Sequence, residues 1–396
     1  MKIKARTFTI AALLILVPAS FLHGGSAAPP ASYYVQENLF ADVVTMAKRV
    51  NADLVSPWGI ALSPSGQWWI ANKNGGVILA LGETASANSV RGSFSVTVPV
   101  PPGDFGLPAS PTGIVFNDSA DFAIAEGRPA RIIAVTEEGI LSGWNPDVDK
   151  NNAIIAADKS ATAVYKGVTI GRFGGKRRLY AANFFGGTID VFDTYFHQVQ
   201  MPANAFYDPG LPNGYVPYNV QEIGGRIYVA YALQAGNQDD AMRGTGYGLV
   251  SIFDSNGKLI GRLKSGSELN APWGIAMAPP GFGTYANMLL IGNSGDGTIA
   301  VYDPDSGEFK GLLKAMNGYL ITLQGLHGLY SESKSPGRKV YFCAGIEEQE
   351  HGLFGVLKPA PSSEKKTSDH RNKNMPKEGK RTETRGIGTY TQGSVL

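Results

Sequence analysis

The sequence predicts an all-β protein, a six-bladed β-propeller that is closed by an N-terminal strand completing the last blade. The segment Pro57-Trp-Gly-Ile-Ala returns as Pro272-Trp-Gly-Ile-Ala. Looser copies of this segment begin at Pro111, Tyr165, Pro217 and Leu326. The six starts are spaced by about 54 residues, a period typical of propeller blades rather than of helical solenoids. The 50 glycines and the 17% of charged residues suit many short strands joined by tight turns.

Residues 1–28 have the layout of a secretory signal peptide. They open with Lys2, Lys4 and Arg6, continue through the apolar residues 10–17 and finish with small residues. The apolar part is shorter than a helix that spans a bilayer. We therefore expect a secreted protein, extracellular or periplasmic, with no integral membrane segment after signal cleavage.

Residues 33–40 are expected to form a strand that has no blade start before it. In the internal repeats, the segment upstream of a blade start forms the outermost strand of the preceding blade, as residues 259–264 do before Pro272. Residues 33–40 hold the same place before Pro57. They should pair with the last blade and so leave no open sheet edge.

Each blade is expected to consist of strands joined by short turns. In the first blade, strands at residues 58–62, 68–71 and 77–81 are separated by Pro64-Ser-Gly and Asn74-Gly-Gly. Glycine supplies the positive φ that such hairpin turns need. The apolar residues come in unbroken runs, which is typical of sheets packed on both faces. The core should therefore lie between neighbouring blades.

Two insertions depart from the repeat. Residues 118–131 separate the first and second strands of blade two, and residues 233–248 belong to blade four. The second insertion carries Asn237, Asp239, Asp240 and Arg243. Long insertions are often functional, but a solvated loop is the commoner outcome and is our expectation for both.

Composition excludes several functions. The formal net charge of +2 and the lack of a basic face along the repeats argue against nucleic-acid binding. Cys343 is the only cysteine, so no intrachain disulfide and no thiolate metal cluster can form, and a buried inert thiol is expected. Residues 359–396 combine many Lys and Arg with few apolar side chains, which predicts a disordered basic tail after a propeller of residues 33–358. We expect a monomer.

Four motifs stand out between residues 33 and 357. They are Ser56-Pro-Trp-Gly-Ile-Ala, Tyr180-Ala-Ala-Asn-Phe-Phe-Gly-Gly-Thr-Ile-Asp-Val-Phe-Asp, Asn270-Ala-Pro-Trp-Gly-Ile-Ala and His351-Gly-Leu-Phe-Gly. In these motifs the chain resembles a family of secreted, mostly bacterial proteins of unknown function. The resemblance implies a six-bladed propeller and export, and it brings no established activity. Many members end in a membrane-spanning sorting signal, a pattern not found in residues 359–396, so anchoring by that route is not expected.

The blade starts are also similar, more loosely, to those of NHL-repeat and gluconolactonase-like propellers. Lactonase-type enzymes of this kind hold a divalent cation in the channel, partly by Asn or Asp just before the glycine of each blade start. The resemblance would imply the same cation here. Here these positions hold Trp58, Thr112, Lys166, Tyr218, Trp273 and His327. None is a carboxylate or an amide, whereas a hard cation prefers several oxygen ligands. We therefore expect neither a metal nor another cofactor, with a divalent cation as the disfavoured alternative.

The same six positions form the main candidate site. If the blade starts face the channel, the rings of Trp58, Tyr218 and Trp273 surround its mouth. Such rings can stack on sugars or hold an apolar group, and Lys166 and His327 could meet an anion. The alternative is that the rings fill the channel as packing.

Secondary candidates are Asn72, Asn183 and Asn293, at the ends of the second strands of blades one, three and five. Their amides could bind a ligand or a cation, but Asn beside a glycine-rich turn more often caps its own backbone.

Two further groups are expected to have ordinary roles. The acidic residues Glu347, Glu348 and Glu350 beside His351 could ligate a metal, yet consecutive carboxylates on a loop usually face water. His197 is expected at the surface or in packing.

Two functions remain open. The first is a binding or interaction module that uses the channel-mouth face to hold an unknown small molecule, a glycan or a protein. The alternative is a channel-based, lactonase-like hydrolase or lyase that acts on a small or sugar-derived substrate. The sequence has no nucleophile elbow, zinc-protease motif or P-loop, and few acids fall at equivalent inward positions, which favours the binder. Whether the protein is an enzyme is left open, because propellers host many functions.

Overall fold

The computed structural model describes residues 33–82, 93–104, 106–332 and 337–361. The chain divides into two compact units, Met1–Ala360 and Pro361–Leu396. The signal peptide expected in residues 1–28 and the tail beyond residue 361 lie outside the described residues. No helix in the described part of the chain has the length and hydrophobicity of a membrane span.

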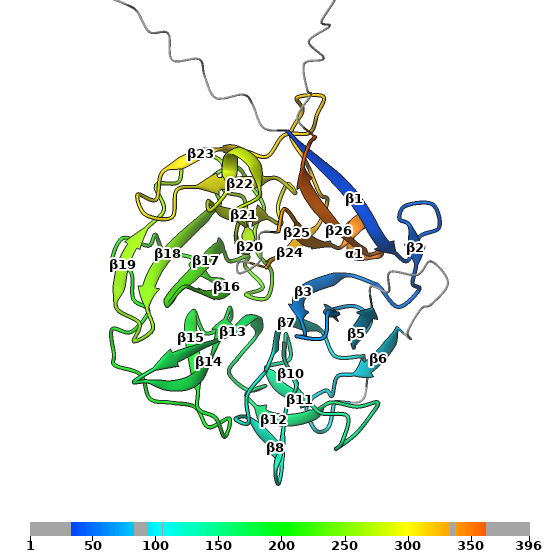
Figure 1. The fold of residues 1–396 in the computed structure, drawn as a ribbon. Coiled ribbons are helices and arrows are strands. Elements are labelled where there is room, and N and C mark those ends of the chain that lie inside the picture. The colour runs from blue at the N-terminus through cyan, green and yellow to red at the C-terminus, as the bar shows by residue number, and fades with distance from the viewer. Residues whose placement is uncertain (1–32, 83–92, 105, 333–336, 362–396) are drawn as a thin grey trace, which may run out of the picture. The chain divides into compact units, whose positions relative to one another are not determined.

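Six small sheets of the first unit surround a common axis and form the predicted six-bladed propeller (Figure 1). The innermost strands, one per blade, are β3 (Pro57–Leu62), β7 (Pro111–Phe116), β13 (Tyr165–Phe173), β16 (Tyr215–Ile223), β20 (Pro272–Met277) and β24 (Leu326–Ser331). The second strands are β4 (Gln67–Asn72), β10 (Ile132–Thr136), β14 (Lys176–Asn183), β17 (Arg226–Leu233), β21 (Leu289–Asn293) and β25 (Val340–Ala344). The third strands are β5 (Val77–Gly82), β11 (Ile140–Trp144), β15 (Thr188–Phe192), β18 (Gly248–Asp254), β22 (Ile299–Tyr302) and β26 (Leu353–Pro359). The outermost strands are β6 (Phe94–Thr97), β12 (Ile154–Asp158), β19 (Leu259–Arg262) and β23 (Phe309–Leu312), in blades one, two, four and five.

The N-terminal strand closes the ring, as predicted. β1 (Tyr34–Ala41) pairs antiparallel with β26, from Tyr34 opposite Pro359 to Ala41 opposite Leu353. The short β2 (Arg49–Val50) extends the same sheet. Asp42 follows β1 and accepts hydrogen bonds from the backbone N–H of Gly352 (2.9 Å) and from Nδ1 of His351 (2.6 Å), which raises the pKa of His351. The first and last strands of the fold are thus joined in one blade.

The core lies between neighbouring blades, because the sheets are apolar on both faces. Between blades one and six, for example, the ring of Trp68 lies 4.2 Å from that of Tyr341 and 5.4 Å from that of Phe354. Cys343 belongs to this cluster, where burial raises the pKa of its thiol well above the usual value. The cysteine is therefore part of the packing.

The innermost strands approach one another so closely that glycine is needed near the axis. A methyl group on Gly59 would lie 2.6 Å from the carbonyl oxygen of Thr112, and one on Gly328 would lie 2.4 Å from that of Trp58. Gly113, Gly167 and Gly274 meet the next blade in the same way. In blade four the equivalent residue is Asn219, whose Nδ2 donates a hydrogen bond to the carbonyl of Trp273 (2.7 Å). The innermost strands therefore approach one another closely all around the ring, including between blades six and one.

The substitution Gly328→Ala should loosen the ring where blade six meets blade one. The added methyl would press on backbone rather than on a flexible side chain, so we expect a loss of about 1–3 kcal/mol in the free energy of unfolding and a fall in Tm of roughly 2–10 °C. Circular dichroism melting curves measure both. The control is Gly261→Ala in the outer strand β19, where a methyl meets nothing within 4 Å. Equal Tm values for the two variants would contradict close packing at the axis.

The first insertion is ordered, which corrects the expectation of a solvated loop. β8 (Ala123–Ala125) and β9 (Arg128–Pro129) form a two-stranded ribbon. Phe122 is fully buried, with its ring 5.6 Å from that of Phe196. Nδ2 of Asn117 donates to the carbonyls of Asp121 and Ala130, both at 2.8 Å. One buried aromatic and one amide thus hold a segment whose composition looks polar.

Candidate functional site

The six predicted channel positions come together at the axis, each on an innermost strand just before the close-packed residue of its blade. They are Trp58, Thr112, Lys166, Tyr218, Trp273 and His327, and none has more than 6% of its surface exposed. Ligand binding by these residues stays a prediction, whereas their convergence is a property of the structure.

The aromatic rings pack on one another. Trp58 stacks on His327 with centroids 3.8 Å apart, and it meets the rings of Trp273 (5.9 Å) and Tyr218 (6.1 Å) edge to face. The indole N–H of Trp273 donates to the carbonyl of Lys166 (2.9 Å). The rings therefore fill the axis, and stacking of a sugar on the buried face of Trp58 would require them to move apart.

His327 cannot supply the positive charge that the sequence suggested. Its Nδ1 lies 2.9 Å from the carbonyl oxygen of Gly325, and burial holds the pKa of His327 well below its usual value. The ring is therefore neutral near pH 7. The hydroxyl of Thr112 is also already hydrogen-bonded within the protein, since it donates to the carbonyl of Tyr165 (2.8 Å).

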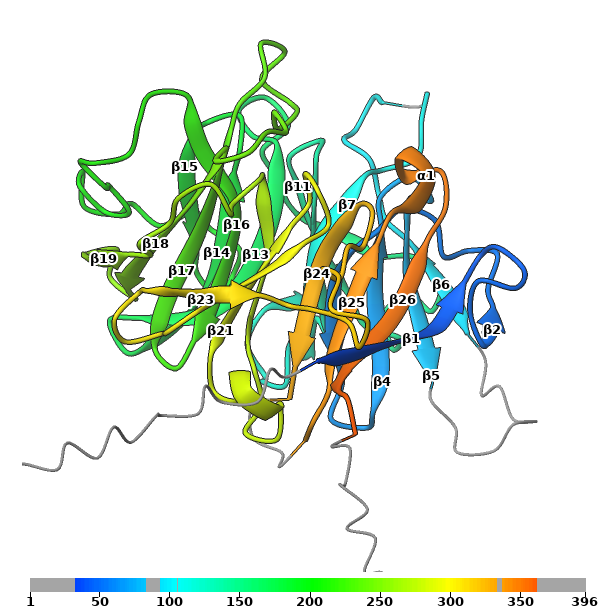
Figure 2. The same ribbon diagram turned by 90° about the horizontal axis from the view of Figure 1, so that it is seen from above.

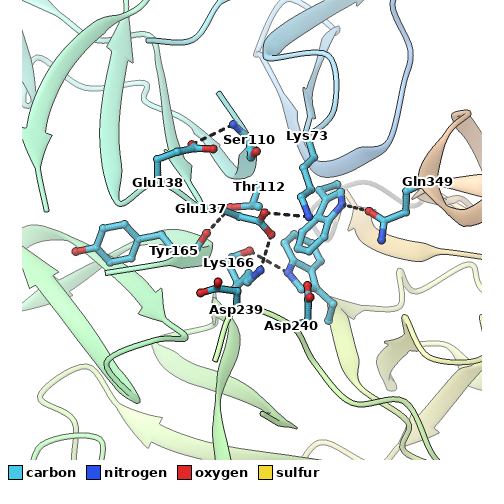
Figure 3. A network of polar contacts seen from close by, with 12 residues as sticks. Lys73, Ser110, Thr112, Glu137, Glu138, Tyr165, Lys166, Asp239, Asp240 and Gln349 are labelled. Carbon is cyan, nitrogen blue, oxygen red and sulfur yellow. Dashed lines mark hydrogen bonds and ion pairs between the residues drawn. The ribbon is translucent and has the colours of Figure 1, made fainter. Parts of the chain in front are cut away.

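Two lysines share one carboxylate beside these rings (Figure 3). Nζ of Lys166 lies 2.5 Å from Oε1 of Glu137, and Nζ of Lys73 lies 2.9 Å from Oε2. Glu137 lies in the turn between β10 and β11, and Lys73 directly follows β4. Burial lowers the pKa of Lys166, while the carboxylate of Glu137 opposes that shift. Glu137 and Lys73 are not among the site residues predicted from the sequence, although a lysine at a channel position indicates that a carboxylate lies nearby.

A cavity of about 110 Å³ lies at this mouth of the channel. It is lined by Trp58, Lys73, Lys166, Tyr218, Asp240, Ala241, Arg243, Ser294 and Gln349. Asp240 and Arg243 come from the second insertion, between β17 and β18, and most of its residues are exposed, as expected of a solvated loop. The loop is nevertheless anchored over the ring, because Gly244 N–H donates to Oδ1 of Asn270 (2.7 Å) and Nε2 of Gln234 donates to the carbonyl of Phe184 (3.0 Å).

One wall of the cavity has a strained backbone. Glu347, Glu348 and Gln349 of the short helix α1 (Ile346–Gln349) have φ of 50°, 57° and 70°. Such left-handed residues other than glycine persist only where the surroundings hold them. Here Oε1 of Gln349 accepts hydrogen bonds from Oγ of Ser56 (3.0 Å) and Nε1 of Trp58 (3.1 Å). Figure 2 shows α1 at one face of the propeller.

The acidic residues around α1 do not gather as a metal site. Among the described residues, no three His, Cys, Asp or Glu side chains converge in that way. His351 contacts Asp42, and its Nε2 lies 3.7 Å from Glu347. The side chain of His197 is 80% exposed, and its Nδ1 lies 3.8 Å from Oδ2 of Asp193.

The three asparagines end the second strands of three different blades, β4, β14 and β21, and ligand binding by them stays a prediction. Oδ1 of Asn183 accepts the N–H of Gly186 (2.9 Å), and Oδ1 of Asn293 accepts that of Asn270 (3.0 Å). These two amides cap backbone, as the alternative interpretation had it. Asn72 is fully buried, and its side-chain nitrogen and oxygen have no hydrogen-bond partner among the described residues.

The axis contains a second, wider cavity at the other end. Along β3, Trp58 faces the cavity at the mouth, Gly59 lines a hollow of about 20 Å³, and Ile60 to Leu62 line a cavity of about 510 Å³. The aromatic rings and the close-packed glycines thus separate two cavities. The charged groups all lie at the mouth where the innermost strands begin, apart from Glu222 at the wide end.

Comparison with known proteins identifies relatives by sequence. No family profile matches the chain. The chain is 30% identical over 322 residues to uncharacterized protein L690 of Acanthamoeba polyphaga mimivirus, which covers 79% of this chain and 82% of L690. It is 30% identical over 329 residues to uncharacterized protein R648 of the same virus, covering 81% of this chain and 78% of R648. These relatives are viral, so they give no support to the mostly bacterial and secreted membership that the motifs implied.

Solved structures with a similar fold are more distant. Virginiamycin B lyase from Staphylococcus aureus aligns with a TM-score of 0.48 and 12% identity, over 82% of this chain and 99% of the lyase. The WD40 β-propeller domain of Doa1 aligns with a TM-score of 0.46 and 10% identity, over 76% of this chain and 78% of that domain. Similarities this low indicate nothing about the activity of this chain. By sequence, the chain belongs to the same family as the uncharacterized mimivirus proteins L690 and R648.

Proposed function

We propose that this protein is a secreted binding module that holds a small carboxylate in the cavity at the channel mouth. The three cations that line this cavity, Lys73, Lys166 and Arg243, carry the proposal. Glu137 pairs with both lysines, Arg243 lies 3.9 Å from Glu348, and Asp240 is the one carboxylate among the lining residues. Lysine and arginine each have several N–H donors, so a bound carboxylate can accept charge-assisted hydrogen bonds from these cations.

The cavity limits the size of the ligand. Its volume of about 110 Å³ is that of roughly four water molecules, which suits an acid with a few carbon atoms and excludes a glycan chain. The hydroxyl of Ser294 also lines the cavity, but it donates its hydrogen bond to the carbonyl of Ala271 (2.8 Å). Because Oε1 of Gln349 already accepts two hydrogen bonds, its amide nitrogen is oriented as a donor.

Export is part of the same proposal. It is supported by the basic, apolar and small-residue order of residues 1–28.

A channel-based hydrolase or lyase is the second candidate, and one observation favours it. Burial lowers the pKa of Lys166 beside the cavity, and a lysine in such a place can serve as a general base. The ion pair with Glu137 favours the charged form of Lys166, which suits binding better than proton abstraction.

The binding test uses acetate and its neutral isostere acetamide, followed by lactate and pyruvate. Acetate at 100 times its Kd should add about 2.7 kcal/mol to the free energy of unfolding, and acetamide should add nothing. We expect Lys73→Met to weaken carboxylate binding roughly tenfold or more in titration calorimetry, since hydrogen bonds to charged groups contribute about 1.5–3 kcal/mol.

The matched control is Lys264→Met, which removes a surface lysine paired with Glu308. It should bind carboxylates as the unmodified protein does. Stabilisation by acetamide equal to that by acetate, or none by any of the three acids, would refute a carboxylate site. Chemical conversion of a bound acid would instead support the second candidate, a channel-based hydrolase or lyase.

A further inference from the structure

Blade three differs from its neighbours at the outer edge. Blades one, four and five have a four-residue outermost strand, and blade two has one of five residues. In blade three, the described sheet ends at β15. A cavity of about 590 Å³ lies along β15, where the fourth strand of the other blades would be. This volume is within the range of ligand sites in proteins.

The chain begins a fourth strand at this edge and then leaves it. Gln198 bridges to Phe192, with hydrogen bonds from Val199 N–H to Val191 C=O (2.7 Å) and from Asp193 N–H to His197 C=O (2.9 Å). Beyond Val199, no further pairing with β15 is present among the described residues.

The remaining backbone groups at this edge form a short ladder without a partner. Alternate residues of a strand point their N–H and C=O to the same edge. Since Val191 and Asp193 point outward, Ile189 does too. The N–H and C=O of Ile189 and the N–H of Val191 therefore face the cavity, and no described backbone group pairs with them there.

The cavity walls define the side chains that would fit. Met201, Phe206 and Pro217 supply apolar surface, while Thr188, Gln198 and Gln200 are polar. Asp190 is the only charged residue among the lining residues, and its carboxylate accepts hydrogen bonds from Tyr165 (2.8 Å), Asn183 (3.1 Å) and Thr188 (2.9 Å). An occupant with apolar residues in alternation with neutral or basic ones would match both walls.

We propose that the outer edge of β15 binds an extended segment of a partner protein as the fourth strand of blade three. The segment would run antiparallel to β15, as β6, β19 and β23 do in their own blades, over about four residues. Its backbone would pair with Ile189 and Val191, and its basic or neutral side chains would face Asp190. This site is separate from the cavity at the channel mouth.

Hydrogen exchange of single amides tests the proposal. The probe is a pool of acetylated hexapeptides that alternate valine with threonine, glutamine or lysine. The control pool has N-methylated valines, which cannot complete the ladder. The internal references are the amides of Ile78 and Ala80 in β5, which hold the equivalent positions and pair with β6.

In the free protein, we expect the amides of Ile189 and Val191 to exchange faster than those of Ile78 and Ala80. The probe pool at about 1 mM total peptide should slow the first pair roughly tenfold or more, and the N-methylated pool should not. Ala203→Trp, which places bulk in the cavity, should abolish this protection. The same change at exposed Ala125 in the β8–β9 ribbon should leave it intact.

Three results would overturn the proposal. The first is no protection of Ile189 and Val191 by the probe pool. The second is protection without peptide that grows with protein concentration, which would assign the edge to a second copy of this chain. The third is protection without peptide that vanishes on removal of residues 362–396, which would assign the edge to the chain's own tail.

Discussion

Deletion of residues 33–41 should leave a protein that aggregates or melts far below the full-length chain. The deletion removes β1 and exposes the edge of β26 along its whole length. It also removes Tyr34 and Phe40, both almost fully buried. Burial of two such side chains contributes roughly 3–6 kcal/mol, a large share of the stability of an ordinary domain.

The measurements are size-exclusion chromatography and a melting curve. Removal of residues 362–396 serves as the control, because that truncation leaves every described strand in place. It should keep both the elution volume and the Tm. A monomer with unchanged Tm after deletion of residues 33–41 would show that the ring does not need this strand.

Glu137→Gln should be the most destabilising single substitution at the channel mouth. It leaves Lys166, with 2% of its side chain exposed, without its closest counter-ion. Breaking a buried ion pair from one side costs about 3–5 kcal/mol, which urea denaturation would measure. Glu308→Gln, which breaks exposed pairs with Lys264 and Lys310, should cost less than about 1 kcal/mol.

The loss in Glu137→Gln should depend on pH in a defined direction. Without the carboxylate, burial and the nearby charge of Lys73 depress the pKa of Lys166 in the folded state further, with only Asp240 opposing them. The unfolded chain then binds more protons than the folded one below the usual lysine pKa, so the stability of the variant should rise with pH. Adding Lys166→Met should restore most of the stability. If neither a higher pH nor Lys166→Met reduces the loss of stability in Glu137→Gln, the broken ion pair is not the cause of that loss.

The sequence predicts the parts of the fold that repeat. Every blade start became an innermost strand, because the same close approach at the axis recurs, with glycine in five blades and Asn219 in blade four. Residues 33–40 were placed in the last blade by analogy with residues 259–264, and β1 and β19 bear this out. In each case the position of a strand follows from a short sequence pattern within or next to its own blade, so it can be predicted one blade at a time.

The site was harder to predict because its parts come from different blades. Glu137 lies in a turn of blade two, whereas Lys73 and Lys166 belong to blades one and three. No local spacing links them, and only the fold brings them together. Asp240 and Arg243 were noticed as members of an insertion, but their place over the channel depends on Asn270, far along the chain. The sequence also predicts an outer strand around Phe196 and His197, whereas the described pairing at this edge is limited to a bridge between Phe192 and Gln198.

The pairing of β1 with β26 also determines when the ring can close during synthesis of the chain. β1 leaves the ribosome first, and its partner follows roughly 300 residues later, a delay of about 15–60 s at ordinary rates of synthesis. Throughout that time β1 lacks its partner, and blade one lacks the neighbour that blade six will provide. Contacts this distant in sequence fold slowly, so the apolar faces of Tyr34, Phe40 and blade one stay uncovered until the last strand has been made.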